Sequence, residues 1–151
     1  MQIIKDQQLI DNIWTFADDE SAITDLDNVT VSLARWLEQH QQLLNRTGKT
    51  GVRLVPGNDV KALSETLADL DLIELDFPVF VDGRLFSVAR LLRSRYNYQG
   101  EIRAVGRYLA DQVFYLHRVG VNGFQFNDEK QLQLALSCFA DFTISYQASS
   151  N

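Results

Sequence analysis

The stretch DGRLFSVARLLRSRYNYQGEIRAVGRYLADQVFYLHR, residues 82–118, contains one full unit of the pattern on which the chain is built. Residues 97–100 are typical of a turn, residues 102–105 are typical of a short strand, and Gly106 is expected to open a second helix. Before the turn, apolar side chains recur at the spacing of one helical face: Leu85, Val88, Ala89, Leu92 and Tyr96.

The same alternation of a short apolar strand and an amphipathic helix continues on both sides of this stretch. It predicts a core of repeated βα units over residues 29–147. An N-terminal hairpin and acidic segment is expected over residues 1–28, and one domain over residues 1–151. The strands are predicted at residues 29–33, 52–55, 72–77, 102–105 and 121–126.

Some helix ends are also marked in the sequence. Asn58 is expected to cap a helix with a stripe from Val60 to Leu70, and Asn127 or Asp128 is expected to cap the last helix. After that helix a terminal strand is predicted from apolar residues that alternate: Phe142, Ile144 and Tyr146.

Five strand–helix alternations indicate an α/β fold with a mainly parallel sheet, and two arrangements remain open. One is an open three-layer, flavodoxin-like sheet, which the chain length slightly favours. The other is a partial (βα)-barrel-like sheet. Strands covered on both faces are nearly all apolar, whereas four polar residues lie in the middle of predicted strands and must either pair with one another or face water: Arg53, Glu74, Arg103 and Gln125.

Composition excludes several classes of protein. The formal net charge is −6 and the pI is about 4.8, which argues against a general nucleic-acid binder. Cys138 is the single cysteine, so no internal disulfide can form. No apolar run approaches the roughly 20 residues of a membrane-spanning helix, and residues 1–12 lack the pattern of a signal peptide. We therefore expect a cytoplasmic protein that does not contact a membrane.

Arginine is concentrated in residues 82–118, which hold half of the 14 basic residues but no lysine. Guanidinium groups bind sulfate, phosphate or carboxylate through paired hydrogen bonds, which lysine does not match. The alternative is that these side chains are solvated or paired with acidic neighbours. The arginines are Arg84, Arg90, Arg93, Arg95, Arg103, Arg107 and Arg118.

An anion site is predicted where these arginines meet the carboxyl ends of the strands, because ligands of α/β sheets bind at that edge. Gly106 adds free backbone N–H groups at a helix start. The candidate ligand-binding residues are Asp76, Asp82, Arg84, Arg90, Arg93, Arg103, Gly106, Asp111 and Gln112.

The predicted helix after Gly106 has two further interpretations. Arg107, Asp111 and Arg118 fall on one helical face and could form intrahelical ion pairs. Gln112 and Tyr115, with Tyr108, share the adjacent face and could form a partner surface.

Other kinds of site find little support in the sequence. His40 and His117 have no histidine or cysteine at metal-ligand spacing, so no metal site is predicted. No dinucleotide or nucleoside triphosphate motif occurs, and no cofactor is assigned.

The segment from Asp82 to Phe126 resembles the uncharacterised bacterial family called domain of unknown function nine-three-four. The resemblance rests on Asp82-Gly83-Arg84, on Phe86-Ser87-Val88-Ala89-Arg90, on residues 100–106 and on Asp111-Gln112. The chain departs from the family pattern at Arg107, where an acid is usual, and at Val119, where a cysteine is usual. Family genes tend to lie beside those for sulfite reductase, so the resemblance implies a role in sulfate or sulfite assimilation, without an established activity.

Two functions follow as expectations. The first is an accessory protein of sulfur assimilation whose arginine-rich surface binds a small anion or a partner, with sulfite reductase as the candidate partner. The second is a small enzyme, with redox-linked chemistry as one option, that acts on a sulfur oxyanion or a phosphorylated metabolite at the carboxyl edge of the sheet. The sequence does not decide whether the chain is an enzyme, and it leaves a homodimer open.

Overall fold

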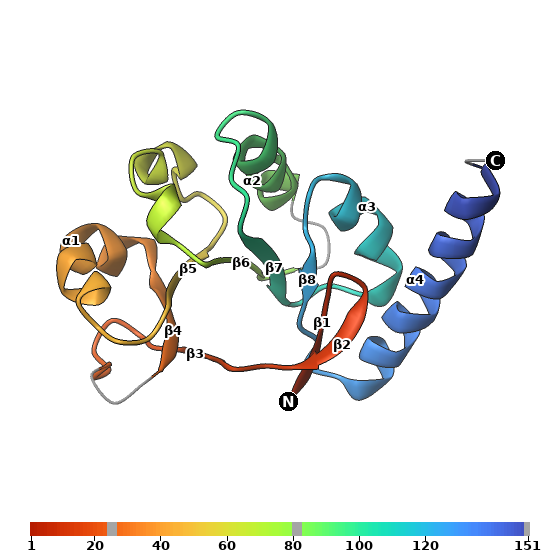
Figure 1. Ribbon diagram of the computed structural model, residues 1–151, viewed down its shortest axis with the longest axis horizontal. Coiled ribbons are helices and arrows are strands. Elements are labelled where there is room, and N and C mark those ends of the chain that lie inside the picture. The colour runs from red at the N-terminus through yellow and green to blue at the C-terminus, as the bar shows by residue number, and fades with distance from the viewer. Residues whose placement is uncertain (24–26, 80–82, 150–151) are drawn as a thin grey trace.

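The computed structural model follows the predicted alternation of strands and helices (Figure 1). It describes residues 1–23, 27–79 and 83–149, and side chains as far as residue 141. The strands are β1 (Gln2–Lys5), β2 (Gln8–Asp11), β3 (Trp14–Phe16), β4 (Asn28–Ser32), β5 (Thr50–Leu54), β6 (Leu72–Phe77), β7 (Glu101–Gly106) and β8 (Gly123–Phe124). The helices are α1 (Leu33–Leu44), α2 (Gly83–Ser94), α3 (Val113–Arg118) and α4 (Glu129–Ser149), with short 3-10 turns η1 (Val60–Leu63), η2 (Leu67–Asp69) and η3 (Ala110–Gln112).

The strands form one sheet in the order β2-β1-β8-β7-β6-β5-β4-β3. From β3 to β8, each strand pairs in parallel with the next strand along the chain. Each crossover therefore advances the sheet in the same direction, and the helices lie around the outside of its curve (Figure 1). The sheet is a curled half-barrel. The flavodoxin-like arrangement, in which the strand order reverses and helices cover both faces, is not confirmed.

The curl brings the two edges of the sheet together. β2 and β3 lie at opposite ends of the strand order, yet only Asn12 and Ile13 separate them in sequence. A link of this length spans at most about 10 Å, so the edges must approach each other there. Figure 1 shows this part of the chain crossing the open side of the half-barrel.

The predicted N-terminal hairpin is confirmed as β1 and β2, which pair antiparallel with Lys5 opposite Gln8. The two-residue turn has positive φ at Asp6 (51°) and Gln7 (67°), the geometry that suits the right-handed twist of a hairpin. β1 also pairs antiparallel with β8, which places the hairpin beside the last strand of the βα units.

The inner face of the half-barrel carries charged side chains. Successive residues of a strand point to opposite faces of the sheet, and the charged residues fall on the face away from the hydrophobic core. The register places Arg53, Glu74 and Arg103 side by side on neighbouring strands. Arg53 Nε donates to Glu74 Oε1 at 3.0 Å, and Arg103 Nε donates to Glu101 Oε2 at 2.6 Å. The polar residues found in the middle of predicted strands therefore pair with one another or with close neighbours.

The outer face of the sheet carries the hydrophobic core, which the helices cover. The buried strand residues on this face include Val31, Val52, Ile73 and Ala104, each fully shielded from solvent. They pack with the buried stripes of α1, α2 and α3, whose members are Leu33, Trp36, Leu43, Leu85, Ala89, Leu92, Val113 and Leu116.

The segment predicted to be a helix after β5 is a pair of 3-10 turns, η1 and η2. Its apolar residues are spaced by three within each turn, Val60 to Leu63 and Leu67 to Leu70, which fits the 3-10 period. Asp59 caps η1 by accepting from the Lys61 N–H, so the expected cap at Asn58 is wrong.

Two expectations for the C-terminal part are also corrected or sharpened. Asp128 accepts the Lys130 N–H at the start of α4, so it is the capping residue of the two that were proposed. α4 continues to Ser149, so the segment that holds Phe142, Ile144 and Tyr146 is helical and the predicted strand there is wrong. The sequence from residue 129 to 149 holds no glycine or proline that would end a helix.

Candidate functional site

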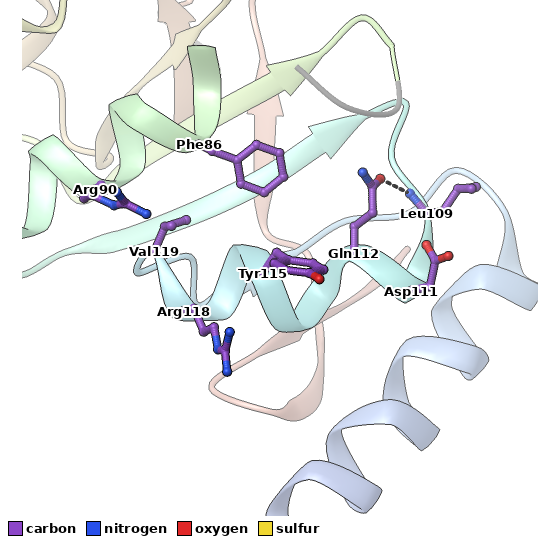
Figure 2. Close-up of a pocket in the computed structure, with 8 residues that line it drawn as sticks. All are labelled: Phe86, Arg90, Leu109, Asp111, Gln112, Tyr115, Arg118 and Val119. Carbon is purple, nitrogen blue, oxygen red and sulfur yellow. Dashed lines mark hydrogen bonds between the residues drawn. The ribbon is translucent and has the colours of Figure 1, made fainter. Parts of the chain in front are cut away.

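A groove of about 690 Å³ lies between α2 and the segment formed by η3 and α3 (Figure 2). We call it the α2–α3 groove. Its volume falls within the range of small-molecule sites, roughly 300–1,000 Å³. Its lining residues are Phe86, Arg90, Leu109, Asp111, Gln112, Tyr115, Arg118 and Val119.

The helical periods explain which side chains reach the groove. In α2, Leu85, Ala89 and Leu92 are buried against the sheet, so Phe86 and Arg90, one turn apart, lie on a neighbouring face of the helix. In α3, Val113 and Leu116 are buried, which leaves Tyr115 and Arg118 outside.

The entry to α3 is fixed by two amide side chains. Gln112 Oε1 accepts the Leu109 N–H at 2.9 Å, as Figure 2 shows. Gln131 on α4 accepts the Ala110 N–H at 2.8 Å. These bonds satisfy backbone donors at the start of the turn, and they position Asp111 and Gln112 at the groove.

The charges of the groove are separated along its length. Arg90 and Arg118 lie toward one end and Asp111 toward the other, with apolar and aromatic side chains between them (Figure 2). All three charged residues are exposed. Within the described part of the chain, neither arginine has a carboxylate within ion-pair distance. One end of the groove is therefore positive.

Three of the predicted ligand-binding residues meet in this groove: Arg90, Asp111 and Gln112. Tyr115, proposed as part of a partner surface, also lines it, whereas Tyr108 is buried at 4% exposure. The expected intrahelical ion pairs do not form among the described residues. Arg107 lies before the helix, which begins only at Val113.

Sequence reasoning left four lining residues out of the site: Phe86, Leu109, Arg118 and Val119. Phe86, Leu109 and Val119 are apolar and resemble core residues in the sequence. Arg118 was counted among the arginines, but its partner across the groove depends on how two separate helices pack.

Arg103 lies on the inner face of the half-barrel, away from the groove. Its side chain is 2% exposed, and its Nη1 donates to Asn12 Oδ1 at 3.0 Å in addition to the bond with Glu101. Asn12 also bonds to the Trp14 N–H at 3.0 Å. Arg103 therefore ties the chain that crosses the open side to the sheet.

Arg93 binds backbone carbonyl groups at the amino edge of the sheet. Its Nη1 donates to the carbonyl oxygens of Tyr98 (2.8 Å) and Gly100 (2.7 Å), and its Nε donates to that of Gly120 (2.9 Å). Its Nη2 donates to Asn122 Oδ1 at 3.2 Å. Burial lowers the pKa of this guanidinium below its usual value, and the nearby Tyr98 and Asp6 oppose that shift.

We expect Arg93→Lys to lower the free energy of unfolding by about 2 kcal/mol, because lysine keeps the charge but cannot reach four acceptors on two loops. Urea denaturation measures the loss. Arg95→Lys is the matched control, since Arg95 is exposed, and it should change stability by less than about 0.5 kcal/mol. Equal stability of the two variants would show that the hydrogen bonds of Arg93 do not stabilise the fold.

Three of the remaining candidates, Asp76, Arg84 and Gly106, lie at or near the carboxyl edge of the sheet. Asp76 is half-buried near the end of β6, and its Oδ1 lies beside Gly106, the last residue of β7. Gly106 has a φ of 90°, and the Arg107 N–H bonds to the Phe77 carbonyl at 2.7 Å. Arg84 is exposed in the first turn of α2, and Asp82 lies outside the described residues.

No group of three or more potential metal ligands occurs among the residues that the structure describes. No helix in that part of the chain is both long and apolar enough to cross a bilayer. Cys138, on α4, is half-buried.

The chain is therefore an α/β protein built as a half-barrel of βα units, with a ligand-sized groove between two of its outer helices. The chain belongs to the family described as a bacterial protein of unknown function (DUF934), whose family model matches residues 51–151. That match confirms the resemblance seen in residues 82–126, and it includes both helices of the groove. No curated protein matches the chain.

Proposed function

We propose that the chain is an accessory protein that binds an anionic group in the α2–α3 groove. The observation that supports this role is the pair of arginines, Arg90 and Arg118, at one end of a groove that is otherwise largely apolar. Neither has an acidic partner in the described structure, so their guanidinium groups can form paired hydrogen bonds to an oxyanion or a carboxylate.

The proposed setting is sulfate or sulfite assimilation in the cytoplasm, and it rests on the family resemblance. The anionic group then belongs to a small ligand or to an acidic surface of a partner such as sulfite reductase. Pull-down of sulfite reductase by the wild-type chain, lost in an Arg90→Ala/Arg118→Ala double variant, is the expected result for the partner form.

The alternative enzyme function needs an acid, a base or a nucleophile that converges with the arginines. Asp111 lines the same groove as Arg90 and Arg118. Arg84 and Arg103, two other candidate ligand-binding residues, do not line the groove, and Arg103 is engaged inside the half-barrel. This geometry favours binding over catalysis.

We expect sulfate, sulfite or phosphate to raise the melting temperature of the wild-type chain in a thermal-shift screen at fixed ionic strength. A ligand of the folded state adds roughly 2.7 kcal/mol at one hundred times its dissociation constant. Arg90→Ala and Arg118→Ala should each remove most of the specific shift, whereas Arg95→Ala should keep it.

The control matters because sulfate and phosphate also stabilise proteins by exclusion from their surface. That effect is the same for all the variants. The proposal fails if Arg90→Ala, Arg118→Ala and Arg95→Ala show the same shift as the wild type for every anion, and sulfite reductase is not retained.

A further inference from the structure

Two aromatic side chains line the α2–α3 groove. Figure 2 shows Phe86 projecting from α2 toward α3, where the ring of Tyr115 lies. Phe86 packs edge-on against the buried Phe77, with ring centroids 5.8 Å apart and an interplanar angle of 66°. This contact supports one side of the Phe86 ring.

Tyr115 has no comparable support. Its side chain is 65% exposed, more than any other aromatic residue in the described part of the chain. Among the described residues, its ring is in contact with no other ring, Phe86 included, and its hydroxyl group has no hydrogen-bond partner. An apolar ring left this open beside a second ring is typical of a contact surface for a ligand.

The size of the groove also points beyond a bare oxyanion. A sulfate or phosphate ion held by Arg90 and Arg118 would occupy only the positive end of a groove of about 690 Å³. The rest of the space is bordered mainly by Phe86, Leu109 and Tyr115, whose surface is apolar apart from one phenol, with the amide of Gln112 beside them. Apolar surface of this kind is stabilised by a ligand that covers it.

Asp111 limits the ligand at the other end. Its exposed carboxylate disfavours a second anionic group there and can accept a hydrogen bond from an amine or a hydroxyl. The order along the groove is therefore a cationic end, two aromatic walls and an acidic end.

We propose that the ligand of the α2–α3 groove is a small molecule with one aromatic or heteroaromatic ring system and one oxyanion group, a phosphate or sulfate monoester that carries the ring directly or through a sugar. The oxyanion pairs with Arg90 and Arg118, and the ring lies against Phe86 and Tyr115. This inference rests on the proposed anion-binding function and adds the chemical class of the ligand.

The test compares matched probes by isothermal titration calorimetry at fixed ionic strength. Phenyl phosphate and phenyl sulfate carry both features, methyl phosphate carries the charge alone, and phenol carries the ring alone. Adenosine monophosphate is included so that a single ring and a nucleotide can be told apart as sources of the same chemistry. We expect phenyl phosphate or adenosine monophosphate to bind about 10-fold more tightly than methyl phosphate, as stacking on aromatic residues provides, and phenol to bind least.

The variants separate the two parts of the site. Tyr115→Ala should remove the advantage of the aromatic esters and leave the affinity for methyl phosphate unchanged, because Tyr115 is exposed and its loss leaves the fold intact. Arg118→Ala should weaken methyl phosphate and the aromatic esters alike. Tyr96→Phe, outside the groove, should change neither.

The outcomes distinguish this inference from the proposed function. Equal affinity of methyl phosphate and the aromatic esters, unaffected by Tyr115→Ala, would overturn the aromatic ligand and leave anion binding intact. An absence of binding by every probe would overturn small-anion binding itself, and the inference with it.

Discussion

Arg103→Met should lower the free energy of unfolding by about 3–5 kcal/mol, the usual cost of breaking a buried ion pair by removal of one partner. The reason is that Glu101 stays behind with 7% exposure. Its carboxylate lies against Gly123, where a Cβ atom would come within 2.2 Å of Oε2. Lys5 Nζ, 3.9 Å from Oε1, is the remaining cation.

Denaturation by urea gives this loss as a lower midpoint at constant slope. The double variant Arg103→Met/Glu101→Met is the informative partner, because replacing both charges with apolar side chains of similar volume is often nearly neutral. We expect it to regain most of the stability. A single variant that loses less than about 1 kcal/mol would show that the Arg103–Glu101 pair does not fix the inner face.

The second large effect is expected at Gly106. With φ at 90°, an alanine there adopts a backbone conformation that L-residues disfavour by about 1–2 kcal/mol. Its Cβ would also lie 2.5 Å from both Asp76 Oδ1 and the Phe77 carbonyl oxygen, which adds about 1–3 kcal/mol of overpacking. Gly106→Ala should therefore destabilise the chain by about 2–5 kcal/mol.

Gly57 provides a control for the backbone part of this cost. It has a φ of 94°, but a Cβ atom built there meets nothing within 4 Å. Gly57→Ala should cost only the backbone term of about 1–2 kcal/mol, and thermal or chemical denaturation compares the two variants. If the two costs are equal, the close approach of β6 and β7 around Gly106 is not a constraint on the fold.

The repeated βα units could be predicted from the sequence because each depends on short-range patterns. The apolar stripe of Leu85, Ala89 and Leu92 and the short strand at residues 102–105 are local signals, and both elements form where they were expected. Local patterns also mislead when two structures share a period. The spacing of Val60, Leu63, Leu67 and Leu70 suits an α-helix as well as two 3-10 turns.

The closure of the sheet could not be predicted in the same way. An open sheet and a half-barrel contain the same alternation of strands and helices, and they differ in the direction of each crossover. The relevant signal was the polar row of Arg53, Glu74 and Arg103, which lie side by side in the observed register. Their positions only became meaningful once the strands were placed next to one another.

The candidate site was predicted in part for a similar reason. Arg90, Asp111 and Gln112 stand out in the sequence by their residue type, and they do line one groove. Phe86 and Tyr115 belong to separate elements, and they line the same groove only because α2 and α3 lie next to each other in the fold. No pattern within either segment specifies that these two helices are neighbours.

The pairing of β1 with β8 affects how the chain can assemble as it is made. Ile4 lies opposite Phe124, and Lys5 lies opposite Gly123, so β1 has β2 as its local neighbour on one side and β8, more than a hundred residues away in sequence, on the other. During synthesis from the N-terminus, more than a hundred further residues are added before β8 exists, so the β1–β2 hairpin lacks this neighbour until then. Contacts this distant in sequence slow folding, and isolated hairpins are at best marginally stable in water. The pairing of β1 with β8 is therefore expected to form late in folding, after the β8 segment has left the ribosome.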